Sequence, residues 1–279
     1  MIQYKRCSEV NIDLVYEAFK DGFSDYIIKM EVSKEDFIQR FLGPEGNLLE
    51  HSFLALEEGG VILGGIKDYE SIKTMRCGTL AVHPNYRGIG VSQKLFELHK
   101  EEAIQHGCKQ LFLEVIVGND RAIHFYNKLG YEKVYDLSYY NLNDLTKIMN
   151  KDCKDSEVKQ LEFPTFKDEI QKWLNFHINW QNDIDYIKKT NNVFYGAYVD
   201  NDLKGSLCVN KQGKISFIFV DKDYRNIGVG MKLLQVAREE LNLSSLSIGF
   251  PNNNLLEGFL KKCGFEKNSL AQYEMYLLL

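Results

Sequence analysis

The chain has 279 residues, of which 44% are apolar and 26% are charged, so it can bury a substantial core and does not have a disordered composition. Its 34 basic and 39 acidic residues give a net charge of −5, which disfavours a nucleic-acid partner because phosphate backbones bind concentrated basic faces. The first residues lack the apolar core of a secretion signal, and no stretch approaches the ~20 apolar residues of a membrane span. We therefore expect a cytoplasmic protein with no membrane partner.

The first half of the chain is predicted to begin with a strand at residues 2–8 and two helices at 11–23 and 33–42. Ser33 is the expected N-cap of the second helix. Gly59-Gly60 marks a hairpin between two strands, and Gly107 follows a long helix. The remaining elements are expected in the order strand 52–58, strand 61–70, strand 74–82, helix 91–106, strand 110–117, helix 120–129 and strand 131–141.

The second half is predicted to repeat this order after a polar, charged bridge near residues 142–156. Its expected elements are strand 157–163, helices 166–176 and 183–189, and strands 193–200, 203–210 and 215–221, followed by helix, strand, helix and strand. The sequence thus predicts two domains, 1–142 and 157–279, joined by a linker at 143–156.

An internal repeat supports this division. The segments around Arg87 and Arg225 match at seven positions, each pair 138 residues apart. Further along, Gly130 and Gly264 occupy equivalent places in two similar segments at an offset of 134. Two landmarks in the same order at nearly equal offsets indicate a duplicated domain.

Six cysteines are scattered along the chain at Cys7, Cys77, Cys108, Cys153, Cys208 and Cys263. They form no C-x-x-C pair, and no histidine lies at metal-binding spacing from them. We expect them to be buried thiols in a reducing compartment, and we expect no metal site.

A glycine turn between a predicted strand and a predicted helix contains Arg87, Gly88 and Gly90. A dinucleotide fingerprint would need a third glycine where Gln93 stands, and the Gly-Lys-Ser/Thr of a P-loop is also missing. The turn can still offer free backbone amides and the positive end of a helix dipole to a diphosphate. Its two glycines would let that ligand approach without a Cβ in the way.

Together these segments resemble two tandem domains of the GNAT superfamily of acyl-CoA-dependent N-acyltransferases, over nearly the whole chain. The family motif V-x-P-x-x-R-x-x-G-x-G/A is matched by Val82, Pro84, Arg87 and Gly90, with Ser92 at the last position. The resemblance implies an α/β (α+β) fold in which each domain is a mixed central sheet flanked by helices, with acetyl-CoA as co-substrate. The residues that it implies for binding of this cofactor are Leu80, Ala81, Val82, Arg87, Gly88, Ile89, Gly90, Val91, Ser92 and Asn119.

A second family landmark, Asn-x-x-Ala-x-x-x-Tyr-x-x-x-Gly-Phe/Tyr, is matched from Asn119 through Tyr126 to Gly130. By resemblance, Asn119 contacts the cofactor arm and Tyr126 is the general acid beside the thioester sulfur. A phenol suits this task because it can protonate a leaving thiolate whose pKa is near ~8.5. The resemblance further implies that a backbone amide after Leu80 or Ala81 holds the oxyanion.

The second copy departs from the family pattern. A possible second cofactor site is formed by Val220, Arg225, Gly228 and Gly230, but Leu260 stands where the tyrosine is expected. Leucine cannot donate a proton. We therefore assign the chemistry to the first domain and regard the second as catalytically degenerate.

The predicted reaction is direct transfer of an acetyl group from acetyl-CoA to a primary amine of a small molecule or a peptide. Asp25, Tyr26 and Glu31 lie where the family builds its acceptor wall. The strand before the glycine turn carries no carboxylate, so the general base is left open, as are the acceptor and the oligomeric state. The alternative is a non-catalytic, acyl-CoA-binding or regulatory protein.

Overall fold

The computed structural model describes residues 2–57, 59–148, 156–173 and 176–279. The chain forms two compact units, which we call unit 1 (Met1–Tyr135 with Gln272–Leu279) and unit 2 (Asp136–Ala271). Each contains a mixed sheet flanked by helices, which confirms the predicted fold class. Among the described helices, none has both the length and the apolar character needed to cross a bilayer.

The sheet of unit 1 has the strand order β1-β2-β3-β4-β5-β12. Neighbouring strands are antiparallel except for β4 and β5, which are parallel. The strands are β1 (Tyr4–Arg6), β2 (Leu48–Ala55), β3 (Gly60–Tyr69), β4 (Ile72–Val82), β5 (Gln110–Ile116) and β12 (Glu266–Leu278). The register of β4 with β5 ends at Arg76 and Phe112, whereas β4 continues beside β3 as far as Val82. The two parallel strands therefore diverge just before the glycine turn.

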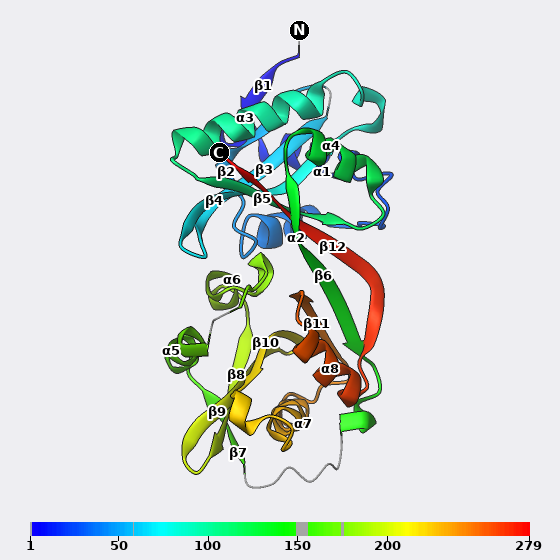
Figure 1. The fold of residues 1–279 in the computed structure, drawn as a ribbon. Coiled ribbons are helices and arrows are strands. Elements are labelled where there is room, and N and C mark those ends of the chain that lie inside the picture. Colours follow the sequence, from blue (N-terminus) through cyan, green and yellow to red (C-terminus); the bar gives the residue numbers. More distant parts are fainter. Residues whose placement is uncertain (1, 58, 149–155, 174–175) are drawn as a thin grey trace. The chain divides into compact units, whose positions relative to one another are not determined.

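Helices cover both faces of this sheet (Figure 1). They are α1 (Ile12–Gly22), α2 (Lys34–Asp36), which continues as a π-helix at Phe37–Phe41, α3 (Val91–Gln105) and α4 (Asp120–Lys128). Asn11, Ser33 and Asn119 cap α1, α2 and α4 by accepting hydrogen bonds from backbone amides. One core lies between the sheet and α3 and α4, and a second lies between the sheet and α1 with the π-helix.

The sheet of unit 2 has the strand order β6-β11-β10-β9-β8-β7, with β10 and β11 parallel. Its strands are β6 (Glu132–Leu142), β7 (Glu157–Leu161), β8 (Asn192–Val199), β9 (Asp202–Asn210), β10 (Lys214–Val220) and β11 (Leu246–Pro251). Its helices are α5 (Phe163–Trp173), α6 (Ile184–Lys188), α7 (Val229–Leu241) and α8 (Asn254–Cys263). The predicted helix at 166–176 thus begins three residues earlier, at Phe163.

The last strand of each half completes the sheet of the other half. Residues 137–142 of β6 pair with β11 in unit 2, and residues 272–278 of β12 pair with β5 in unit 1 (Figure 1). The compact units therefore differ from the ranges 1–142 and 157–279, because alternating apolar residues predict a strand but do not specify its partner. Part of the expected linker also belongs to unit 2, where Leu145 and Ile148 are buried in the core, and residues 149–155 lie outside the described residues.

Candidate active site

The glycine turn of unit 1 has an open backbone. Gly88 and Gly90 adopt φ values of +81° and +95°, and a Cβ added at either would meet no atom within 4 Å among the described residues. α3 begins at Val91, and its first amides have no carbonyl partner within the helix. This combination of free amides, a helix N-terminus and missing side chains fits a diphosphate.

The side chain of Arg87 has a bracing role in this geometry. Its Nε donates to the Val82 carbonyl at 2.9 Å, and one terminal nitrogen donates to the Gly22 carbonyl at 3.1 Å. The guanidinium also forms a bidentate pair with Asp25 at 2.6 and 2.7 Å, which lowers the pKa of Asp25 through the hydrogen bond from Arg87. The arginine therefore ties the end of α1 to the turn, and the backbone amides are left to face the ligand.

The predicted acceptor residues separate into two groups. Tyr26 hydrogen-bonds the side chain of Asn119, whose Oδ1 also caps α4 by accepting from the Ala122 amide at 3.3 Å. Asp25 and Tyr26 thus contact residues predicted to bind the cofactor. Glu31 is exposed and pairs with Lys29 at 2.5 Å. The structure brings the first two into the site and leaves the third in solvent.

Tyr126 lies on α4 and is 8% exposed. Its hydroxyl hydrogen-bonds Cys77, the residue of β4 directly after the last one paired with β5. Burial, together with the neighbouring Cys77, raises the pKa of Tyr126 well above its usual value. The phenol is therefore protonated at neutral pH, at the point where the parallel strands diverge.

The other predicted cofactor residues line the path from β4 to α3. Ala81 and Val82 are buried at the end of β4, and Leu80 beside them is half-buried. Val91 is buried and anchors the first turn of α3 in the core. At the turn itself Ile89 is 60% exposed, and Ser92 is partly exposed in the first turn of α3.

A pair of buried carboxylates that the sequence analysis missed lies next to this divergence. Glu114 of β5 and Glu274 of β12 are directly opposite in the antiparallel register, with their side chains almost completely buried. Leu113 and Val115 pack under α3 and α4, so Glu114 faces the other side of the sheet. Arg76 lies 4.0 Å from its carboxylate. The strand before the turn has no carboxylate, and these two carboxylates come together only because β5 pairs with the last strand of the chain.

The second glycine turn repeats the backbone of the first. Gly228 has φ +101°, and Asn226 takes the place of Gly88 with φ +65°. Arg225 Nε donates to the Val220 carbonyl at 2.8 Å, as Arg87 does to Val82, but its guanidinium lies over the ring of Phe219. A Cβ on Gly230 would come within about 3.0 Å of the Phe259 ring, so this glycine serves helix packing.

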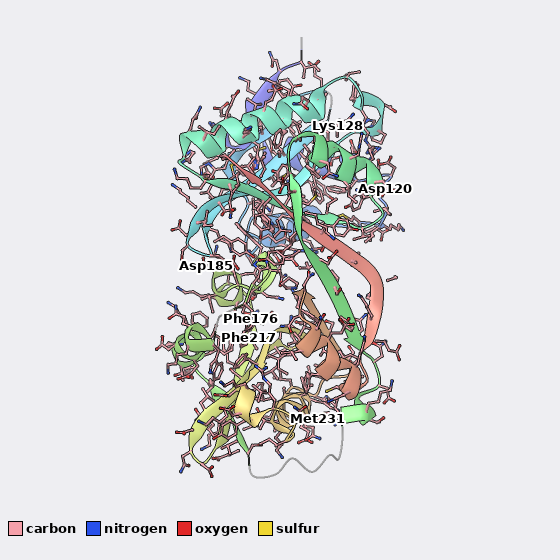
Figure 2. The ribbon with its side chains drawn as sticks, in the orientation of Figure 1. Asp120, Lys128, Phe176, Asp185, Phe217 and Met231 are labelled. Carbon is pink, nitrogen blue, oxygen red and sulfur yellow. The ribbon has the colours of Figure 1, made fainter. Side chains whose placement is uncertain are left out.

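The residues at the positions of Tyr126, Glu114 and Glu274 are different in unit 2. The 134-residue offset carries Glu114 to Ile248 and Glu274 back to Tyr140, and these two residues are again directly opposite each other. Leu260 is fully buried in the place of the tyrosine. On β10, Phe217 stacks with Phe176 at 6.5 Å between ring centroids (Figure 2). Aromatic and aliphatic side chains thus occupy the positions of Tyr126, Glu114 and Glu274 in unit 2.

Comparison with known families matches both halves of the chain. The model of the acetyltransferase (GNAT) family matches residues 12–131, and that of a GNAT acetyltransferase domain matches residues 150–278. An acetyltransferase of Yersinia pestis is 31% identical over 119 residues, which are 40% of this chain and 83% of the relative. An acetyltransferase of Sodalis glossinidius is 31% identical over 118 residues, covering 40% and 82%.

Solved structures share the whole fold at low sequence identity. A tandem GNAT protein from the clavulanic acid biosynthesis pathway matches with a TM-score of 0.70 at 13% identity, covering 100% of this chain and 98% of that one. A putative acetyltransferase from Pyrococcus horikoshii matches with a TM-score of 0.64 at 16% identity, covering 100% and 89%. With both family models matching, the chain belongs to the GNAT acetyltransferase family and has two domains of this kind.

Proposed function

We propose that unit 1 transfers an acetyl group from acetyl-CoA to a primary amine of a small molecule or peptide. The observation that carries this proposal is the contact of the Tyr126 hydroxyl with Cys77, where β4 leaves β5 just before an open glycine turn. The proton donor lies where β4 leaves β5, and the turn that can bind a diphosphate follows the end of β4. This separation suits a long substrate with a thioester at one end and a diphosphate further along.

The turn would hold the diphosphate of the co-substrate through the first backbone amides of α3, with Gly88 and Gly90 leaving room for it. Asn119 contributes from the start of α4. When bound, acetyl-CoA supplies an activated acyl group on a thiol leaving group. Arg87 and Asp25 act as positioning residues, because their bidentate pair joins the turn to the segment after α1.

Tyr126 is the proposed general acid. Its raised pKa keeps the phenol protonated at neutral pH, so its hydroxyl can donate to the thiolate that leaves beside it. The neighbouring Tyr131 lies in the same core, and burial and Cys77 raise its pKa too, but its hydroxyl has no hydrogen-bond partner among the described residues. The pKa of both tyrosines is raised, so the hydrogen bond to Cys77 is what distinguishes Tyr126.

Glu114 is the proposed proton acceptor for the amine, with Glu274 as its partner. An amine near pKa ~10.4 is protonated at neutral pH and must lose a proton before it attacks. The two carboxylates are buried and directly opposite each other on adjacent strands, within the sheet whose strands diverge beside Tyr126. Arg76 places a positive charge 4.0 Å from Glu114 and 3.9 Å from Glu45.

The test is release of free thiol from acetyl-CoA in the presence of an amine panel. Tyr126→Phe is expected to lower kcat by roughly 100- to 10,000-fold, the usual contribution of a general acid, with little change in the KM for acetyl-CoA. The matched control is Tyr131→Phe, which removes a hydroxyl from the adjacent buried ring. It is expected to leave thiol release nearly unchanged.

Two results would contradict the proposal. If no amine in a broad panel gives thiol release while calorimetry shows tight coenzyme A binding, the chain is a binding or regulatory protein. If Tyr126→Phe and Tyr131→Phe have equal effects, Tyr126 has a packing role and the proton comes from another group.

A further inference from the structure

A cluster of two histidines and one glutamate lies on unit 1, where β2 meets α3. Glu102 Oε1 forms a hydrogen bond with His51 Nδ1 at 2.8 Å. The same oxygen lies 3.1 Å from His106 Nε2. The three potential ligand atoms lie within 4.8 Å of one another. None of the three residues has a role in the proposed acetyl transfer.

The donor set suits a zinc-like ion. Two imidazole nitrogens and one carboxylate oxygen are a known set of three protein ligands for zinc, with water in the fourth place. Bonds of ~2.0–2.2 Å in a tetrahedral arrangement place ligand atoms about 3.4 Å apart. The two nitrogen-to-oxygen separations are 2.8 and 3.1 Å, so the histidine nitrogens would move about half an ångström away from the carboxylate oxygen to admit an ion.

The surroundings hold the carboxylate in position for this task. Glu102 is only 3% exposed, and its second oxygen accepts a hydrogen bond from Arg6 at 2.6 Å. Contacts with Arg6 and His51 hold its two oxygens in fixed directions. Ligating carboxylates in proteins are oriented by such outer hydrogen bonds.

A second observation comes from His99, one helical turn before Glu102. This histidine is fully buried, and neither ring nitrogen has a hydrogen-bond partner among the described residues. It stands three residues before Glu102, which places both on the same face of α3. Buried imidazoles without partners are uncommon and suggest a missing neighbour.

We propose that His51, Glu102 and His106 bind a divalent transition-metal ion of the zinc type at the junction of β2 and α3. The sequence analysis looked for cysteine spacing and could not find this site, because one ligand comes from a strand about fifty residues before the other two. Only the four-residue spacing of Glu102 and His106 on one helix face was visible in the sequence.

The test is calorimetric titration of the full chain with Zn²⁺ after treatment with a chelator. One site per chain is expected, and His106→Ala should weaken binding by at least about tenfold, since even outer-shell changes cost 10- to 100-fold. His106 is 45% exposed at the end of α3, so this variant is expected to fold. The matched control is His124→Ala, an exposed histidine on α4, which should bind Zn²⁺ as the unchanged chain does.

Titration with Co²⁺ identifies the donor atoms. Nitrogen and oxygen ligands should give visible d–d absorption without the near-ultraviolet band of a cobalt–thiolate bond. The proposal is overturned if Zn²⁺ does not bind stoichiometrically, if His51→Ala and His106→Ala both bind like the control, or if the thiolate band appears. In the first of these cases the cluster is a hydrogen-bonded network only.

Discussion

Met275 provides a test of the strand exchange, because it lies at the end of the chain and is buried in the core of unit 1. It is 1% exposed, pairs with Leu113 across the β12–β5 ladder and belongs to the core beneath α3 and α4. Truncating a buried methionine to alanine typically costs 2–5 kcal/mol. We expect Met275→Ala to lower the free energy of unfolding by about this amount, and the loss should fall on unit 1.

Hydrogen exchange can assign the loss to a unit. At about 1.4 kcal/mol per factor of ten, the expected destabilisation speeds exchange of β5 amides by roughly 30- to several-thousand-fold. Both tryptophans, Trp173 and Trp180, lie in unit 2, so their fluorescence reports separately on that unit. Leu278→Ala is the matched control on the same strand, because Leu278 is 77% exposed and should change stability by less than about 0.5 kcal/mol.

The reasoning is refuted if Met275→Ala leaves exchange of β5 unchanged and instead accelerates exchange in β10 and β11. That result would mean that the last strand of the chain completes the sheet of its own half.

Other changes test the site. Ser92→Asp puts a negative charge in the first turn of α3, where it should stabilise the helix but raise the Kd for coenzyme A in calorimetry. Asn226→Asp, in the glycine turn of unit 2, should not alter the KM for acetyl-CoA. Glu114→Gln should lower kcat by about 100- to 10,000-fold, with Glu101→Gln as an exposed control. Asp25→Asn should destabilise the protein by less than about 1 kcal/mol at pH 7, because the pair is partly exposed. Since the pKa of Asp25 is lowered in the folded state, this difference in urea unfolding should shrink as the pH falls below about 4 and vanish only below the lowered pKa of the folded state.

The secondary structure could be predicted well from the sequence because most of its signals are local. Asn119, Ser33 and Gly107 mark helix ends by capping or by a positive φ, and the structure places α4, α2 and α3 accordingly. The π-helix at Phe37–Phe41 was expected as ordinary helix. In this segment Phe37 and Phe41 pack against Phe19, a contact between distant residues that no local pattern encodes.

The site was predictable where a motif is continuous in the sequence and obscure where it depends on strand pairing. The backbone of the glycine turn has the predicted open geometry, whereas the guanidinium of Arg87 binds Asp25 and two carbonyls. The pairing of Glu114 with Glu274 was out of reach, because these residues are 160 positions apart and meet only through an exchanged strand.

This exchange gives the second half of the chain a structural role that does not depend on catalysis. The chain leaves unit 1 within β6, builds unit 2, and returns with β12 to the free edge of β5. Without residues 272–278, unit 1 would expose that edge and lose Met275 from its core and Glu274 from beside Glu114. Unit 2 has Leu260 in place of the tyrosine and Ile248 and Tyr140 in place of the two glutamates. It is still required, because its folding positions the strand that completes the proposed active site of unit 1.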